Sequence, residues 1–243
     1  MSWYNDWFNS EYYLKVYRHR DEVEAERLVS LILNNVNLEG GSNILDMACG
    51  SGRHAISFAK KGFNITAIDI SQRLISDAKQ NASEVNVEID FVLSNILEYT
   101  DKRKYHLAVN LFTSIGYFEN DKDNFKIIDK ANDFLLKEGY FVLDYFNKEF
   151  LLKNLVPTTV FSENGLRITQ NRSIQNNRVR KDISIDKNGS VEKFYESVRL
   201  FSYLEIHNFL KSAGFTIYKE FGDYFGDNFN VDTSPRLIIF AHK

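Results

Sequence analysis

The chain contains the stretch Ile-Leu-Asp-Met-Ala-Cys-Gly-Ser-Gly-Arg-His-Ala at residues 44–55, and Ala-Ile-Asp-Ile-Ser follows at residues 67–71. The apolar run at residues 43–47 predicts a short buried strand, and residues 51–61 predict a helix that Gly62 ends. Residues 64–69 are rich in β-branched side chains and predict a second strand. A glycine-rich turn between a strand and a helix, followed about twenty residues later by an acidic strand end, is the layout of a nucleoside-cofactor site in an open α/β sheet.

Two glycines and two carboxylates in this layout could hold such a ligand. Gly50 and Gly52 allow a ligand to approach the backbone, and Asp69 is placed to accept hydrogen bonds from both hydroxyls of a ribose. The loop also fits the dinucleotide fingerprint GxGxxA, a weak signal by itself. Asp46 decides between a dinucleotide and a nucleoside cofactor without phosphates. A carboxylate at the strand end repels a pyrophosphate in a low-dielectric crevice. It suits a ligand with an ammonium group and no phosphate, and S-adenosylmethionine (SAM) is such a ligand.

Strands and helices continue to alternate along the chain on both sides of this layout. Upstream, residues 1–20 are dense in aromatic side chains, and residues 21–37 have apolar side chains at helical spacing. Downstream, Ser71 is expected to cap a helix. Further strands are predicted at residues 89–93, 107–110 and 140–145, and a further helix at residues 121–136. This alternation favours a parallel sheet covered by helices.

Between residues 158 and 201 the alternation stops. Short β-prone runs are separated by turn signals at Asn164-Gly165, Asn176-Asn177 and Asn188-Gly189, which predict an antiparallel insertion of three or four strands. The chain then returns to a predicted helix at residues 202–213 and to strand-like runs at residues 215–221 and 236–241. We therefore expect four segments, namely an N-terminal aromatic segment and helix (1–37), a cofactor-binding core (38–150), a β insertion (151–201), and a C-terminal helix with the last two strands of the core (202–243).

The composition argues against several classes of protein. The 243 residues carry a net charge of −3 and include one cysteine and two isolated prolines. No run approaches the roughly 18 apolar residues of a membrane span, and no secretory signal is visible, so no membrane association is expected. A lone cysteine, Cys49, rules out a disulfide framework and fits a reducing cytoplasm, which is the expected location. The weakly acidic balance argues against a nucleic-acid partner.

Residues 45–52 together with Asp69 strongly resemble motif I and the acidic loop of class I SAM-dependent methyltransferases. Residues 112–118 are similar to the segment after the fourth strand in a branch that acts on small molecules, and the aromatic N-terminus followed by residues 17–21 is similar to the lid of that branch. The resemblance implies a Rossmann-like fold with a seven-stranded, mostly parallel sheet, helices on both faces, and an antiparallel β insertion. It also implies SAM as the cofactor.

The resemblance assigns the cofactor contacts residue by residue. Asp46 would face the methionine ammonium, Asp69 would hold the ribose, and Ile70 would pack on the adenine. Asn95 stands where many members have an aspartate, and its side-chain oxygen could accept a hydrogen bond from the adenine amino group. The full expected set comprises Tyr17, Arg20, Asp46, Ala48, Cys49, Gly50, Gly52, Asp69, Ile70, Asn95, Ile96, Leu111 and Phe112, and no metal is expected.

Methyl transfer from a sulfonium is an in-line displacement, so the main task of the protein is to position the reactants and to exclude water. A general base is needed only when the acceptor arrives protonated. The catalytic candidates are Tyr117, His19 and Tyr145, with Asn147, Thr113 and Ser114 expected nearby. Residues with side chains suited to an acceptor pocket are Arg172, Tyr195, Arg199, Tyr224 and Arg236.

The acceptor is narrowed by what the chain lacks. It has no Pro-Pro motif of the kind used to methylate exocyclic amines of nucleic-acid bases, and its one cysteine lies inside the cofactor loop rather than at a nucleophile position. A small-molecule acceptor is therefore expected. Methylation of RNA or protein stays open as an alternative, as does a non-catalytic SAM-binding module. The insertion could roof the acceptor pocket or pair with a second copy to form a homodimer.

Overall fold

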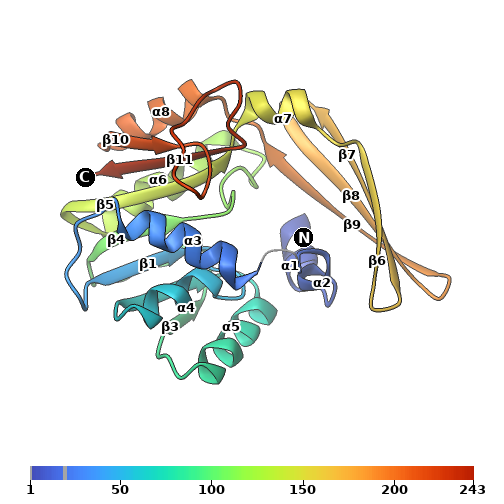
Figure 1. Ribbon diagram of the computed structural model, residues 1–243, viewed down its shortest axis with the longest axis horizontal. Coiled ribbons are helices and arrows are strands. Elements are labelled where there is room, and N and C mark those ends of the chain that lie inside the picture. The colour runs from blue at the N-terminus through green and yellow to red at the C-terminus, as the bar shows by residue number, and fades with distance from the viewer. Residues whose placement is uncertain (1, 19–20) are drawn as a thin grey trace.

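The computed structural model describes residues 2–18 and 21–243 and contains two β-sheets (Figure 1). The strands are β1 (Asn43–Met47), β2 (Asn64–Asp69), β3 (Asp90–Leu93), β4 (Tyr105–Asn110), β5 (Leu135–Phe146), β6 (Thr158–Glu163), β7 (Leu166–Gln175), β8 (Arg178–Lys187), β9 (Ser190–Arg199), β10 (Thr216–Phe221) and β11 (Arg236–His242). The helices are α1 (Trp3–Phe8), α2 (Tyr13–Val16), α3 (Glu22–Leu33), α4 (Arg53–Lys60), α5 (Gln72–Glu84), α6 (Asp121–Phe134), α7 (Lys148–Asn154) and α8 (Tyr203–Ser212).

The large sheet has seven strands in the order β10-β11-β5-β4-β1-β2-β3. Strands β1 to β5 are parallel, whereas β11 runs antiparallel to β5 and β10 runs antiparallel to β11. Helices α6 and α8 bury apolar side chains against one face of this sheet. Helices α3, α4 and α5 bury theirs against the other face, where Phe58 of α4 is fully enclosed. The predicted fold class is thereby confirmed.

Local sequence signals explain where the elements begin and turn. The Ser71 hydroxyl accepts a hydrogen bond from the amide of Leu74 at 3.1 Å and so caps α5, as predicted. In the insertion, the hairpin turns fall at the predicted asparagines, with Asn164, Asn176 and Asn188 at φ values of 47°, 49° and 53°. Four antiparallel strands, β6 to β9, result.

The point where the chain changes direction lies between β1 and β4. From β1 the chain winds outward through β2 to β3 and then crosses to β4, on the other side of β1. In an open α/β sheet, the helices that follow two such neighbouring strands lie on opposite faces, which leaves a crevice at the carboxyl ends of the strands. Here the crevice is bordered by the turn after Met47 and by the turn after Asn110.

The N-terminal helices lie between the large sheet and the insertion (Figure 1). Trp7, Tyr12 and Val16 form a third apolar cluster with four aliphatic side chains of the insertion strands, Leu166, Ile168, Ile183 and Ile185. The N-terminal segment therefore packs on the second sheet, although the two are more than a hundred residues apart in the sequence. Within the described ranges 2–18 and 21–243, no helix is both long and apolar enough to span a bilayer.

Candidate cofactor and acceptor site

A cavity of about 510 Å³ lies at the carboxyl ends of β1 and β4, within the usual size range of small-molecule sites. Its walls come from three parts of the chain, the large sheet, the N-terminal helices and the insertion. A smaller pocket of about 60 Å³ adjoins it, lined by residues that follow β1, β2 and β3. Phe8, Ala48, Ser114 and Tyr117 border both spaces.

Asp46 is a buried carboxylate on the cavity wall. Only 1% of the residue is exposed, and its Oδ2 has no hydrogen-bond partner among the described residues. Burial, with a further contribution from the charge of Asp69, raises the pKa of Asp46 to about 7. A buried carboxylate oxygen without a partner is costly unless a ligand supplies a donor or a positive charge. The ammonium of a methionine group fits this requirement.

Asp69 holds the glycine-rich loop from the neighbouring strand. Its Oδ2 accepts a hydrogen bond from the amide of Gly50 at 2.8 Å, and its Oδ1 accepts one from the amide of Ser71 at 2.8 Å. Burial raises the pKa of Asp69, although the backbone donors act in the opposite direction. Asp69 lines the smaller pocket together with Ile70, Asn95 and Ile96, which is the environment expected for a ribose and an adenine.

The two glycines of the loop have different reasons to be glycine. Gly50 has a φ of 58° and lines the cavity, and a Cβ at this position would meet nothing within 4 Å. Gly52 has a φ of 81°, and a Cβ there would lie 3.0 Å from the Cβ of Ala78 and 3.2 Å from the ring of Phe91. It is absent from the described lining of both spaces. Close packing of α4 against α5 and β3 accounts for this glycine, and its contact with the methionine stays a prediction.

The turn after β4 is strained and is held by a buried ion pair. Phe112 and Thr113 have φ values of 64° and 63°, which residues other than glycine rarely adopt. The Asp144 carboxylate accepts hydrogen bonds from the Phe112 amide at 3.0 Å and from Nε and Nη2 of Arg236 at 2.8 and 2.6 Å. The Tyr224 hydroxyl donates to the same carboxylate at 2.8 Å. Asp144 thus fixes the strand end that forms the floor of the cavity.

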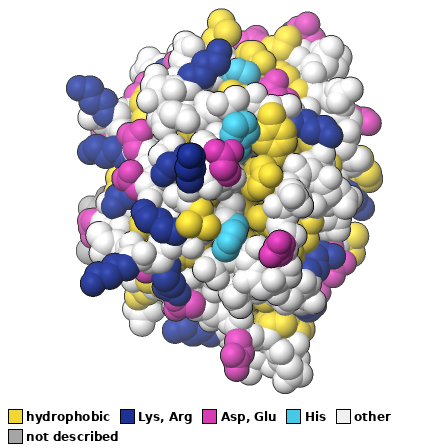
Figure 2. Space-filling model, turned by 90° about the vertical axis from the view of Figure 1, so that its left-hand side faces the viewer, with side chains coloured by type: hydrophobic (Ala, Val, Ile, Leu, Met, Phe, Trp, Pro, Cys, Tyr) yellow, Lys and Arg dark blue, Asp and Glu magenta, His cyan; other side chains and the backbone are white. Residues whose placement is uncertain are grey.

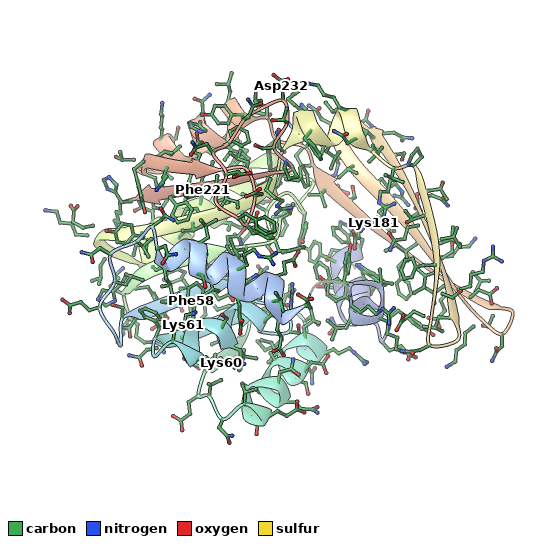
Figure 3. All side chains as sticks on the ribbon, in the orientation of Figure 1. Phe58, Lys60, Lys61, Lys181, Phe221 and Asp232 are labelled. Carbon is green, nitrogen blue, oxygen red and sulfur yellow. The ribbon has the colours of Figure 1, made fainter. Side chains whose placement is uncertain are left out.

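The opposite wall contains a second buried network, centred on Glu196 of β9. Its carboxylate accepts hydrogen bonds from Trp7 Nε1 at 2.7 Å, from Lys181 Nζ at 2.7 Å and from the Tyr17 hydroxyl. Figure 3 labels Lys181 on the insertion, on the side that faces the N-terminal helices. Although burial acts in the opposite direction, the charge and hydrogen bond of Lys181 hold the pKa of Glu196 below its usual value. Glu196 is therefore ionised and ties the N-terminal segment to the insertion.

The structure brings most of the predicted site residues together. The large cavity is lined by Tyr17, Asp46, Ala48, Cys49, Gly50, Leu111, Phe112, Thr113, Ser114, Tyr117, Arg172 and Arg236. The smaller pocket is lined by Ala48, Asp69, Ile70, Asn95, Ile96, Ser114 and Tyr117. The predicted lid contact Arg20 and the predicted catalytic candidate His19 lie outside the described residues.

The assignment of Tyr145 as a catalytic candidate is corrected by its surroundings. The side chain is fully buried, and its hydroxyl donates to the backbone carbonyl of Arg199 and accepts from the amide of Phe201 at 3.4 Å. It packs in the apolar cluster between the sheet and helices α6 and α8 and is not among the residues that line the cavity. Burial also raises the pKa of Tyr145, which keeps its hydroxyl protonated and so unable to act as a base.

Four other predicted neighbours of the acceptor are occupied by structural contacts. Asn147 donates to the carbonyls of Val231 and Ser234, and Tyr224 donates to Asp144. Arg199 pairs with Glu205 at 3.0 Å and with Asp121 at 3.3 Å. The Tyr195 ring lies under the guanidinium of Arg180 and has its centroid 6.2 Å from that of Trp3. These residues are Asn147, Tyr195, Arg199 and Tyr224, and each has a role in packing rather than in lining the cavity.

Sequence reasoning missed several charged residues of the cavity. Lys181 and Glu196 face each other across the β8–β9 hairpin, and the predicted turn at Asn188-Gly189 already sets this pairing. Arg53 lines the cavity beside Gly50, with its guanidinium 3.6 Å from Glu24. Asp144 could have been noticed as the one carboxylate in the apolar run of β5. The register of the β8–β9 hairpin could therefore have indicated the Lys181–Glu196 pair, and the carboxylate within the apolar run of β5 could have indicated Asp144.

The fold and the site are those of an α/β enzyme that binds a nucleoside cofactor, and similarity to known proteins identifies the family. The model of the methyltransferase domain family matches residues 38–216, so this chain belongs to that family. A protein of Geobacillus sp. (strain WCH70) that carries a provisional methyltransferase name is 24% identical over 221 residues, which cover 87% of this chain and 88% of that protein. The predicted membership among class I SAM-dependent methyltransferases is thereby confirmed, and with it the cofactor.

Solved structures share the fold over nearly the whole chain. A SAM-dependent methyltransferase from Clostridium acetobutylicum ATCC 824 superposes with a TM-score of 0.80 at 18% identity and covers 95% of both chains. The sugar N-methyltransferase KedS8 from Streptoalloteichus sp. ATCC 53650 has a TM-score of 0.72 at 16% identity and covers 95% of this chain and 92% of its own. At these identities the likeness shows the fold, including the β insertion.

Proposed function

We propose that this protein transfers the methyl group of SAM to a small-molecule acceptor held between the large sheet and the β insertion. The observation that carries the proposal is the unpartnered, buried oxygen of Asp46 on the wall of a cavity of about 510 Å³. A cationic methionine group satisfies that oxygen, and the volume suits the methionine end of the cofactor with a small acceptor. The structural neighbour KedS8 is a sugar N-methyltransferase, which adds support for a small acceptor.

Catalysis then rests on how this chain positions the reactants. When bound, SAM supplies the electrophilic methyl group. Asp46 would hold the ammonium end, Asp69 would hold the ribose, and Ile70 would pack on the adenine. Orientation of this kind can contribute roughly 7–11 kcal/mol to a two-substrate reaction. The N-terminal helices and the insertion line the cavity and would limit the access of water to the reacting atoms.

Tyr117 is the residue that we assign beside the reacting atoms. It lines both the large cavity and the smaller pocket. Its ring centroid lies 5.2 Å from that of Trp3 and 5.7 Å from that of Phe8. These contacts link the N-terminal helices to the loop after β4. Tyr117 is therefore placed to orient the acceptor and, where the acceptor arrives protonated, to pass on its proton.

The surroundings of the cavity favour a small acceptor over RNA. The N-terminal helices and the insertion both contribute to the lining, so the acceptor space lies between three parts of the chain. Figure 2 shows the face of the molecule turned away from the insertion, where Lys and Arg side chains lie among Asp and Glu side chains. A surface of mixed charge offers little attraction to a phosphate backbone, whose binding requires clustered positive charge.

Calorimetric titration tests the cofactor, and product release tests the reaction. We expect S-adenosylhomocysteine (SAH), the product form of the cofactor, to bind with micromolar affinity and NADH to give no heat of binding. With SAM present, small molecules that carry an amine or hydroxyl nucleophile should raise the rate at which SAH is released, and tRNA should not. Binding of NADH without SAH would overturn the proposal, and activity only on tRNA would replace the acceptor class.

The affinity for SAH is expected to depend on pH through Asp46. Its pKa of about 7 in the free protein means that a proton competes with the ligand ammonium, so SAH affinity should fall about tenfold per pH unit below 7 and level off above it. Because this pKa lies above the unfolded value of about 3.9, the contribution of Asp46 to the stability of the unliganded protein is complete below pH 4 and is lost as the pH rises to 7. Calorimetry and urea unfolding across this range measure both trends.

The control for this pH dependence is Asp46→Asn. It removes the titrating group at that position and keeps Asp69, so its SAH affinity should be weak and nearly independent of pH. A wild-type affinity that stays flat between pH 5 and 8 would contradict the role given to Asp46. An Asp46→Asn variant that keeps the full pH dependence would move that role to Asp69.

A further inference from the structure

The positively charged groups of the large cavity differ in their partners. Arg18 lies 2.7 Å from Glu163, Arg53 lies 3.6 Å from Glu24, Lys181 lies 2.7 Å from Glu196, and Arg236 lies 2.6 Å from Asp144. Arg172 of β7 lines the same cavity but has no carboxylate within 4.0 Å in the described part of the chain. Its charge is therefore uncompensated by an ion pair.

Neutral oxygens hold the Arg172 guanidinium in place. Nη1 donates to the carbonyl of Val156 at 3.3 Å and to the Thr159 hydroxyl at 3.2 Å, and Nη2 donates to the side-chain oxygen of Gln170. The amide of Arg172 is itself fixed by the carbonyl of Pro157 at 2.7 Å. These contacts restrict the side chain without neutralising it, and a guanidinium held in one orientation loses little further entropy when it binds an anion.

The surroundings of Arg172 strengthen its attraction for an anion. The side chain is partly buried, and the cavity that it borders is also lined by Leu151, Leu155, Val179 and Val198. Apolar walls lower the local dielectric constant, so that an ion pair formed there is stronger than one formed in water. A guanidinium binds carboxylates and phosphates in a two-pronged manner, which also fixes the orientation of the anion.

We propose that the methyl acceptor is an anion, with a carboxylate or phosphate group that binds Arg172. This inference rests on the proposed function and names the class of its acceptor. Asp46 and Asp69, which belong to the large sheet, bind the cofactor. Arg172 belongs to the insertion and binds the acceptor. With its charged end held by Arg172, the nucleophilic atom of the acceptor is directed back toward the methyl group. Arg172 thus acts as a specificity residue that selects acidic small molecules.

The carboxylate of the cofactor is another anion in this site, and the experiment must separate the two. The cofactor carboxylate belongs beside the ammonium that Asp46 binds, where Arg53 of α4 borders the cavity close to Gly50. Arg172 comes from the other sheet. If Arg172 binds the acceptor, its replacement leaves SAH affinity unchanged and removes the binding of a second anion to the SAH complex.

The test uses thermal unfolding of the full-length protein saturated with SAH. Inorganic phosphate and acetate serve as two separate probes, each compared with chloride at the same ionic strength. At about ten times its dissociation constant, a bound anion should raise the Tm of the wild-type complex by about 3 °C. A rise in Tm with phosphate but not with acetate identifies a phosphorylated acceptor. A rise with acetate but not with phosphate identifies a carboxylic acid. A rise with both identifies an acidic acceptor of either kind.

Three variants complete the test. Arg172→Gln should lose the rise in Tm and keep the SAH affinity of the wild type by calorimetry, whereas Arg172→Lys should keep part of the rise. Arg167→Gln is the matched control, because Arg167 is an exposed arginine of the same strand that does not line the cavity. An equal rise in Arg172→Gln and in the wild type, or no rise in the wild type, overturns the inference. Failure of the wild type to bind SAH would instead overturn the proposed function.

Discussion

Asp69→Ala is expected to weaken the binding of SAH by at least a hundredfold. The carboxylate accepts backbone hydrogen bonds from Gly50 and Ser71 and is assigned to the two ribose hydroxyls. Each hydrogen bond to a charged group contributes about 1.5–3 kcal/mol, so the loss of two corresponds to roughly a hundredfold or more in affinity. Because the Gly50 amide also loses its partner, the loop that faces the methionine loosens at the same time. Calorimetric titration with SAH measures the loss.

The matched control is Asp90→Ala on the adjacent strand β3. The side chain of Asp90 is 49% exposed and pairs with Arg103 on the surface, away from the residues that line the two spaces. Its replacement should leave SAH affinity within a factor of two of the wild type. Circular dichroism of both variants checks that they are folded. If folded Asp69→Ala binds SAH within tenfold of the wild type, the ribose site has been assigned to the wrong residue.

Asp144→Ala is expected to reduce the free energy of unfolding by about 3–5 kcal/mol, because it leaves the Arg236 guanidinium buried without its counter-charge. The wild-type carboxylate is fully buried and also accepts from the Phe112 amide and the Tyr224 hydroxyl. Since Asp144 holds the turn after β4 in its left-handed conformation, methyl transfer should fall as well. Urea denaturation, followed by tryptophan fluorescence, measures the change in stability.

A second ion pair and a double variant serve as controls for this prediction. Asp182→Ala breaks the pair with Arg180, whose side chains are 50% and 44% exposed, and should cost less than about 1 kcal/mol. The double variant Asp144→Ala with Arg236→Met removes both charges and should recover part of the lost stability. A loss below 1 kcal/mol in Asp144→Ala would show that the pair contributes little to the fold.

Much of the fold could be predicted because its signals are local. The strand at β1, the cap at Ser71 and the turns at Asn164 and Asn188 each depend on a few neighbouring residues, and the structure has all of them where the sequence placed them. The cofactor loop was recognised for the same reason. Glycine-rich turns and acidic strand ends occur at fixed spacing, which a single sequence displays.

The acceptor side of the site could not be predicted in this way, because its parts come from distant segments. Asp144 and Tyr145 are consecutive residues of a strand and point to opposite faces of the sheet, and the sequence does not say which face meets the cavity. The reason for Gly52 depends on Ala78, in another helix. Lys181 meets Tyr17 only when the N-terminal helices have packed on the insertion.

The packing of the N-terminal helices on the second sheet has a consequence for how relatives of this protein diverge. Trp7 and Tyr17 donate hydrogen bonds to Glu196, and Tyr12 donates one to Glu192. The N-terminal segment and the insertion therefore share one interface. A substitution in the insertion that admits a new acceptor must remain compatible with the side chains of residues 3–17. These two segments are therefore expected to change together during evolution. The loop that binds the cofactor is not part of this interface and need not change with them.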